Sequence, residues 1–173
     1  MSTFSLEPTP TAQWQALVCQ AAQDSKTSLS EEMESYLVFL LMRHIKDNQV
    51  GGSAIAMEYL RALHENSVIK QENLRDVADH CLLLSGLFPQ IAEKRNVSIS
   101  YFVNVGRTAY LDLSETITHI GSVLFKEISE QFIHLMDILL TIRSYSTTPV
   151  LLPIQAFDLW NDTGSDVAYK LIR

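Results

Sequence analysis

The apolar pattern between residues 122 and 145 constrains the fold class of this chain more than any other feature of its sequence. Its apolar residues recur at intervals of three and four, which places them on one side of an α-helix. They are Phe125, Ile128, Phe132, Leu135, Met136, Leu139 and Ile142. No segment shows a convincing alternation of apolar and polar residues, the pattern of a strand. The sequence therefore predicts an all-α fold, with this stripe in the core rather than in a dimer interface.

The same period predicts a single compact bundle of about six main helices, followed by short C-terminal helices. The main helices are expected at about 10–25, 31–46, 53–65, 71–85, 99–119 and 122–145, and shorter ones at 91–94, 153–160 and 166–172. Expected N-caps are Thr9, Ser98, Ser165 and Ser28, the last in a capping box with Glu31. Gly86 is expected to end its helix in the left-handed conformation.

Residues 36–42 form the longest unbroken apolar run, Tyr-Leu-Val-Phe-Leu-Leu-Met. A helix that is apolar on every side is normally packed by several neighbours. We therefore expect the helix over 31–46 to be the central helix of the fold, with this run buried. Seven residues are far fewer than the roughly 20 that span a bilayer, so no membrane association is expected.

Composition indicates one globular domain. The chain has 173 residues, of which 47% are hydrophobic, enough to bury a core. We expect residues 1–10 to form a mobile N-terminal arm and residues 11–173 to form a single domain. No secretory signal pattern is visible, which predicts a cytoplasmic location, although a secreted effector with an unstructured signal is an alternative.

Charge and cysteine content limit the partners. Thirteen Lys and Arg against 20 Asp and Glu give a net charge of −7. Nucleic acid is therefore an unexpected partner, because phosphate binding needs a basic surface. Cys19 and Cys81 lie in apolar helical patterns and are expected to be buried thiols. They form no CxxC motif and predict no zinc site.

Histidines following carboxylates offer one alternative function, a metal site inside the bundle. Three pairs are spaced four residues apart: Asp76 with His80, Glu115 with His119, and Glu130 with His134. Neighbours at this spacing share a helix face. However, the last pair belongs to a polar stripe that also contains Glu127, Asp137 and Thr141, so a solvated face is the favoured interpretation and no metal or cofactor is predicted.

The segment around Gly106 offers a second alternative, a site for a small anionic ligand. Glycine in a helix interior costs about 1 kcal/mol relative to alanine, which indicates a close approach by another helix or a ligand. Arg107 suits carboxylate or phosphate recognition. The candidate ligand-binding residues are Tyr101, Asn104, Arg107, Tyr110 and His44. The competing interpretations are that Gly106 serves packing, that Arg107 forms an internal ion pair joining two helices, and that His44 is a buried neutral histidine satisfied by a hydrogen bond.

Three segments resemble a group of uncharacterised bacterial all-helical proteins. They are Leu84-Ser85-Gly86-Leu87-Phe88-Pro89; Ser100-Tyr101-Phe102 with Gly106-Arg107-Thr108-Ala109-Tyr110; and Leu159-Trp160-Asn161-Asp162-Thr163-Gly164-Ser165 with Ala168 and Leu171. The resemblance covers about half of the chain. It implies a bacterial source and a helical domain, and it assigns no catalytic residue.

No catalytic constellation is visible: Gly-x-Ser-x-Gly and the phosphate-binding glycine loops are absent. The favoured hypothesis is a non-enzymatic cytoplasmic helical protein that binds a protein partner or a second copy of itself. The anionic-ligand and metal sites remain alternatives.

Overall fold

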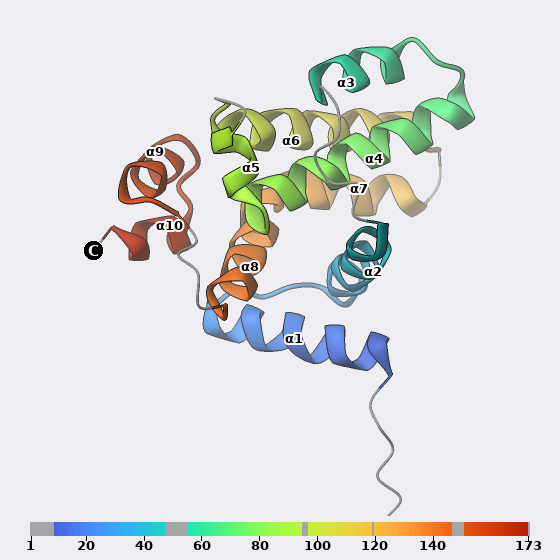
Figure 1. Ribbon diagram of the computed structural model, residues 1–173. Coiled ribbons are helices and arrows are strands. Elements are labelled where there is room, and N and C mark those ends of the chain that lie inside the picture. Colours follow the sequence, from blue (N-terminus) through green and yellow to red (C-terminus); the bar gives the residue numbers. More distant parts are fainter. Residues whose placement is uncertain (1–8, 48–54, 95–96, 119, 147–150, 173) are drawn as a thin grey trace, which may run out of the picture.

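A computed structural model describes residues 9–47, 55–94, 97–118, 120–146 and 151–172. Within these residues the chain forms ten helices and no strand, which confirms the predicted all-α fold (Figure 1). They are α1 (Pro10–Asp24), α2 (Glu31–Asp47), α3 (Ile55–Leu63), α4 (Ser67–Gly86), α5 (Pro89–Lys94), α6 (Ile99–Thr116), α7 (Ile120–Glu130), α8 (Phe132–Ser144), α9 (Pro153–Thr163) and α10 (Asp166–Leu171). The expected mobile arm lies almost entirely outside the described residues.

The central helix is α4, and the expectation that residues 31–46 fill this role was wrong. α4 packs against α3, α5, α6 and α8, and residues 81–87 are all buried (Figure 1). α2 packs mainly against α1 and α7. Most of its apolar run is buried, but Phe39 is 57% exposed. α2 therefore keeps one side open, although its sequence is apolar all round.

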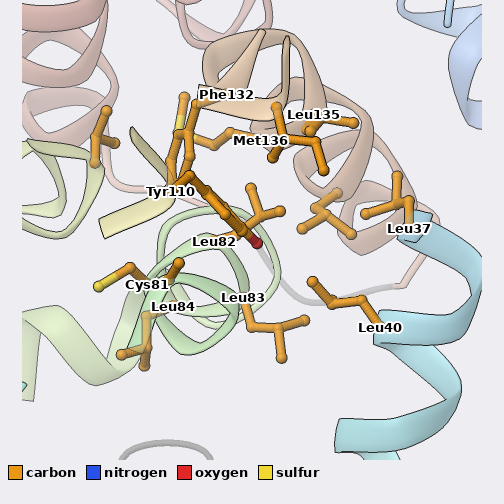
Figure 2. Close-up of a cluster of buried hydrophobic side chains, with 14 of the residues drawn as sticks. Leu37, Leu40, Cys81, Leu82, Leu83, Leu84, Tyr110, Phe132, Leu135 and Met136 are labelled. Atoms are coloured by element: carbon orange, nitrogen blue, oxygen red, sulfur yellow. The ribbon is translucent and has the colours of Figure 1, made fainter. Parts of the chain in front are cut away.

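The core lies where α2, α4, α6 and α8 meet. Figure 2 shows Leu82 and Leu83 of α4 close to Tyr110 of α6, with Phe132 of α8 on the other side of the tyrosine ring. The Tyr110 and Phe132 ring centroids are 6.1 Å apart. Apart from Ile142, which is half-buried, every member of the 122–145 stripe is buried, so the assignment of this stripe to the core is confirmed.

That stripe nevertheless spans two helices instead of one. The backbone leaves helical geometry at Gln131 (φ −98°, ψ 13°), between α7 and α8. α7 packs chiefly against α6, whereas α8 packs against α4 and α1. These neighbours require different helix axes. Tertiary packing thus breaks a helix that contains neither glycine nor proline near the break.

Side-chain caps explain where five of the described helices begin. The side chains of Thr9, Ser98 and Ser165 each accept a backbone N–H as predicted. The capping box at Ser28 was wrong, because Ser30 Oγ accepts the Met33 N–H at 3.2 Å. α4 begins earlier than expected because the Asn66 side chain accepts the Ile69 N–H at 3.3 Å.

Two glycines permit close helix packing. A Cβ on Gly106 would lie 2.7 Å from Phe132 Cε2 and 2.8 Å from Cys81 Cβ, so α6 approaches α8 and α4 closely at this point. A Cβ on Gly86 would lie 2.5 Å from Leu139 Cβ. Gly86 is not left-handed as expected. Among the described glycines that conformation occurs at Gly164, with φ 73°, after α9.

Candidate functional site

The C-terminal helices α9 and α10 form a tight helical hairpin. Pro153 occupies the first turn of α9, where its missing N–H costs nothing. Gly164 then ends α9 and Ser165 caps α10, so the end of one helix and the start of the next are set by two consecutive residues. Ala156, Leu159 and Ala168 are buried and fix the inner side of the hairpin. Figure 1 shows the pair together at one side of the molecule, apart from α2.

Asp137 of α8 anchors this hairpin. Its side chain is only 3% exposed, accepts the Ser165 hydroxyl at Oδ1 and accepts the Asp166 N–H at Oδ2 at 3.2 Å. Burial raises the pKa of Asp137 to about 6, although these hydrogen bonds act in the opposite direction. The expectation that Asp137 and Thr141 share a solvated face with Glu130 was wrong, since both are buried.

A second anchor joins α9 to α6. Ser100 Oγ donates to the Asp162 carboxylate at 2.7 Å. The hairpin is therefore held at α8 and at α6 by polar contacts, in addition to its buried apolar side.

The outward side of the hairpin exposes a connected set of large side chains, which we call the aromatic face: Ile154, Phe157, Trp160 and Tyr169. The Phe157 and Trp160 ring centroids are 6.0 Å apart, and those of Trp160 and Tyr169 are 5.3 Å apart. Ile154 lies one helical turn from Phe157.

The four residues are between 36% and 69% exposed. With roughly 150–250 Å² for a side chain of this size, the open area is about 400 Å². A patch this large on a monomer often marks an interaction site.

Acidic side chains lie on the side of α9 that faces α6, where Asp162 accepts from Ser100 and Asp158 lines a small hollow with Ser98 and Ser100. Asp158 and Asp162 follow Ile154 at intervals of four, whereas Phe157 and Trp160 follow it at intervals of three, so the two rows diverge around the helix. Both are exposed, as is Asp166 at the start of α10. Lys170 is the basic residue described on this hairpin. The acidic side chains of α9 are thus separate from the aromatic face.

A buried polar network around Asp79 is the second notable cluster. The hydroxyls of Tyr36 and Tyr110 both donate to Asp79 Oδ1, the latter at 2.6 Å. His44 Nε2 lies 3.5 Å and Arg75 Nε 3.8 Å from Oδ2. Burial first, and then the Asp79 charge, raises the pKa of both tyrosines well above the ordinary value. The network therefore joins α2, α4 and α6 through a carboxylate with several donors around it.

A polar hollow of about 280 Å³ lies beside this network between α3 and α4. It is lined by Arg61, Glu65, Asn73, Asp76, Val77 and His80. The His80 ring packs edge-on against His44 at 4.9 Å, and burial, followed by the nearness of His44, lowers the pKa of His80. Cationic and anionic groups are mixed in this lining, so its charge favours no single class of ligand.

The predicted ligand-binding residues divide between different environments. Tyr110 and His44 belong to the buried Asp79 network. Arg107 and Asn104 are exposed on α6, and Tyr101 is half-buried with its ring against Phe102. The structure thus does not bring the five residues into one site.

Arg107 links α6 to α7 through the backbone. Its Nε donates to the Ser129 carbonyl at 3.3 Å, and Ser129 Oγ donates to the Arg107 carbonyl at 2.8 Å. The contact joins two helices as one interpretation expected, but its acceptor is a carbonyl and not a carboxylate. Anion binding at Arg107 stays a prediction.

His44 is buried, as expected, yet the hydrogen bond expected to satisfy it is missing. Its Nε2 has no hydrogen-bond partner within the described part of the chain. The Asp79 carboxylate lies 3.5 Å from this nitrogen, too far away for a hydrogen bond of good geometry.

The predicted histidine–carboxylate pairs form no hydrogen bond or ion pair with one another where they are described. Asp76 pairs with Arg43, and His134 Nδ1 lies 2.5 Å from Gln131 Oε1. His119 lies outside the described residues. Among the residues with assigned positions, no group of three or more His, Cys, Asp and Glu side chains could hold a metal ion.

Neither Cys19 nor Cys81 forms a disulfide within the described residues. Cys81 is buried as expected, whereas Cys19 is partly exposed and donates to Glu34 at 3.3 Å. Across the described helices, none is long and apolar enough to cross a membrane.

Sequence reasoning missed the aromatic face and the two buried carboxylates. Ile154, Phe157 and Trp160 recur at intervals of three, which is a helical signal, but a stripe of this kind normally indicates a core-facing side. Asp79 lies between Val77 and Cys81 in a buried stretch. An acidic residue within an apolar helical segment could have predicted a buried, hydrogen-bonded carboxylate at this position.

Comparison of the chain with protein-family models, with curated proteins and with solved structures finds no match.

Proposed function

We propose that this chain is a non-enzymatic binding protein that docks a partner protein on its aromatic face. The observation that carries the proposal is the outward side of α9 and α10, where four large side chains form a connected exposed surface. Aromatic residues are enriched in protein interfaces because they supply much contact area at little entropic cost.

The anchoring of the hairpin supports this function. Asp137 and Ser100 hold α10 and α9 against the body of the protein. The aromatic face is therefore presented on ordered helices, which lowers the entropic cost of binding. Cysteines without a disulfide are usual in the cytoplasm, and together with the resemblance to bacterial proteins they support a bacterial cytoplasmic setting as part of the proposal.

The test is gel filtration with light scattering, applied to the tagged protein in an extract of its own cells and to the purified protein. The proposal expects a complex in the extract that is larger than the 19.5 kDa chain, and a monomer after purification. Trp160→Ala should release the monomer in the extract.

The matched control is Phe39→Ala, which removes another exposed aromatic ring from a different part of the surface. This variant should keep the complex. A monomer in the extract, or a complex that Trp160→Ala leaves intact, would contradict the proposed function.

A further inference from the structure

We infer that the hairpin of α9 and α10 is a pH-sensitive unit, which undocks from α8 more readily as the pH rises because Asp137 ionises beneath it. The inference concerns how the hairpin is held and does not depend on the proposed partner. Its basis is a buried carboxylate at the junction between the hairpin and the body of the protein.

The hairpin has a small apolar contact with the rest of the chain. Its principal neighbours are α6 and α8. Its buried apolar residues are Leu159 and two alanines, Ala156 and Ala168, and a half-buried Val167 packs beside them. Segments with few buried apolar contacts can open separately, at a lower cost than unfolding of the whole protein. Polar contacts therefore carry a large share of the docking of this hairpin.

Asp137 holds the start of α10 with both carboxylate oxygens. Oδ1 accepts the Ser165 hydroxyl, and the Ser165 oxygen in turn accepts the Ala168 N–H at 3.1 Å, which caps the helix. Oδ2 accepts the Asp166 N–H at 3.2 Å. The protonation of this one side chain therefore acts directly on the contact between α8 and α10.

The charge of Asp137 is not balanced by a cation in the described part of the chain. No basic side chain of α1, α4, α6, α7 or α10 that the structure describes forms an ion pair with it. Its charged neighbour on α10 is Asp166, a second acid, and Lys170 is exposed. Burial of an anion without a counter-ion favours the protonated form. Burial accordingly raises the pKa of Asp137 to about 6, against the opposing effect of its hydrogen bonds.

Linkage fixes the direction of the effect. Undocking exposes Asp137 to water, where it ionises at its ordinary pKa of 3.8. The docked state binds the proton more tightly, so docking is strongest below pH 3.8 and weakens as the pH rises through 6. With these two values the opening constant of the hairpin increases about tenfold between pH 5 and pH 7.

Hydrogen exchange of the full chain, followed by mass spectrometry between pH 5 and pH 7.5, measures this opening. Each rate is divided by the intrinsic amide exchange rate at the same pH, which gives opening constants for peptides from α10 and from the central helix α4. We expect α10 to open more readily than α4, with an opening constant that rises about tenfold from pH 5 to pH 7. One constant shared by both helices, or a constant for α10 that stays level or falls with pH, would overturn the inference.

Asp137→Asn tests whether this carboxyl group is the one that titrates. The variant should make the opening of α10 independent of pH. The matched control is Asp158→Asn, which removes an exposed carboxylate from the same hairpin and should keep the tenfold change. The same pH dependence in Asp137→Asn as in the native protein would assign the effect to another group, and the inference would be wrong.

Ser165→Ala keeps the test decisive if the hairpin of Asp137→Asn does not dock at any pH. This variant loses the hydrogen bond to Asp137 and the cap of α10, but it retains the carboxylate. Its α10 should open more readily than that of the native protein at every pH. The increase between pH 5 and pH 7 should be at least as large, because the lost hydrogen bond favoured the ionised form. A smaller increase would contradict the role given to Asp137.

Discussion

Asp137→Asn should change how the stability of the protein depends on pH. The carboxyl group has a pKa of about 6 in the folded chain, against 3.8 as its ordinary value. The difference of 2.2, at about 1.36 kcal/mol for each pH unit, corresponds to about 3 kcal/mol. This free energy is the cost of keeping the ionised carboxylate buried against α10.

The sign follows from the raised pKa. The folded chain binds the proton more tightly than the unfolded chain, so the favourable contribution is complete below pH 3.8 and is lost as the pH rises through 6. The unfolding free energy of the native protein minus that of Asp137→Asn should therefore fall by up to about 3 kcal/mol between pH 4 and pH 7.

Urea denaturation followed by far-UV circular dichroism at several pH values measures this difference. Asp158→Asn is the control, since that carboxylate is exposed and its removal should leave the pH profile nearly unchanged. A difference between native protein and Asp137→Asn that stays constant, or grows with pH, would refute the assignment of Asp137 as a buried anchor.

Three further predictions concern packing, capping and the Asp79 network, each measured as an unfolding free energy. Gly106→Ala should lower the unfolding free energy by about 1–2 kcal/mol, because the cost of overpacking exceeds the gain in helix propensity. Gly121→Ala should be neutral or slightly stabilising, because a Cβ added at Gly121 would have its nearest contact at 3.6 Å. Equal effects of the two substitutions would contradict close packing at Gly106. Ser30→Ala should lower the unfolding free energy by about 1 kcal/mol, and Ser28→Ala should leave it almost unchanged. The opposite order of effects would support the capping box that the sequence predicted at Ser28. Tyr110→Phe should lose about 1–3 kcal/mol, because it removes a donor from the buried Asp79 carboxylate; unchanged stability would mean that this bond contributes little.

Much of the helical architecture could be predicted from periodicity and caps. The stripe over 122–145 identified core residues, and Thr9, Ser98 and Ser165 marked helix starts. These signals are local. The geometry of a single helical turn sets the spacing of the apolar residues, and it leaves the first N–H groups without an acceptor in the helix, so that a nearby side chain caps them. The same local reading gave Gly106 a packing role as one interpretation.

The rest depended on tertiary contacts that no local pattern contains. The chain breaks at Gln131 because α7 and α8 pack on different neighbours. The prediction that α2 is the central helix was wrong, because the apolar content of a helix does not determine how many other helices pack against it. The role of Asp79 was not predicted, because the tyrosines that donate to it lie on helices distant in sequence.

The aromatic face illustrates the same limit. An apolar stripe on a short helix predicts burial, and the sequence does not say which stripes find a partner within the chain. Ala156 and Leu159 cover the inner side of α9 with small and medium side chains, which leaves Phe157 and Trp160 facing outward. The tertiary structure, and not the sequence pattern, therefore identifies this apolar stripe as an exposed candidate interface.

Photo-crosslinking in the cells that make the protein tests the central claim most directly. A photoreactive phenylalanine analogue at position 157 lies on the aromatic face, and the same analogue at position 39 lies on another exposed site. The account predicts a discrete protein adduct at 157 that disappears with Trp160→Ala, and no matching adduct at 39. No adduct at 157, or the same adducts at both positions, would contradict a docking role for α9 and α10.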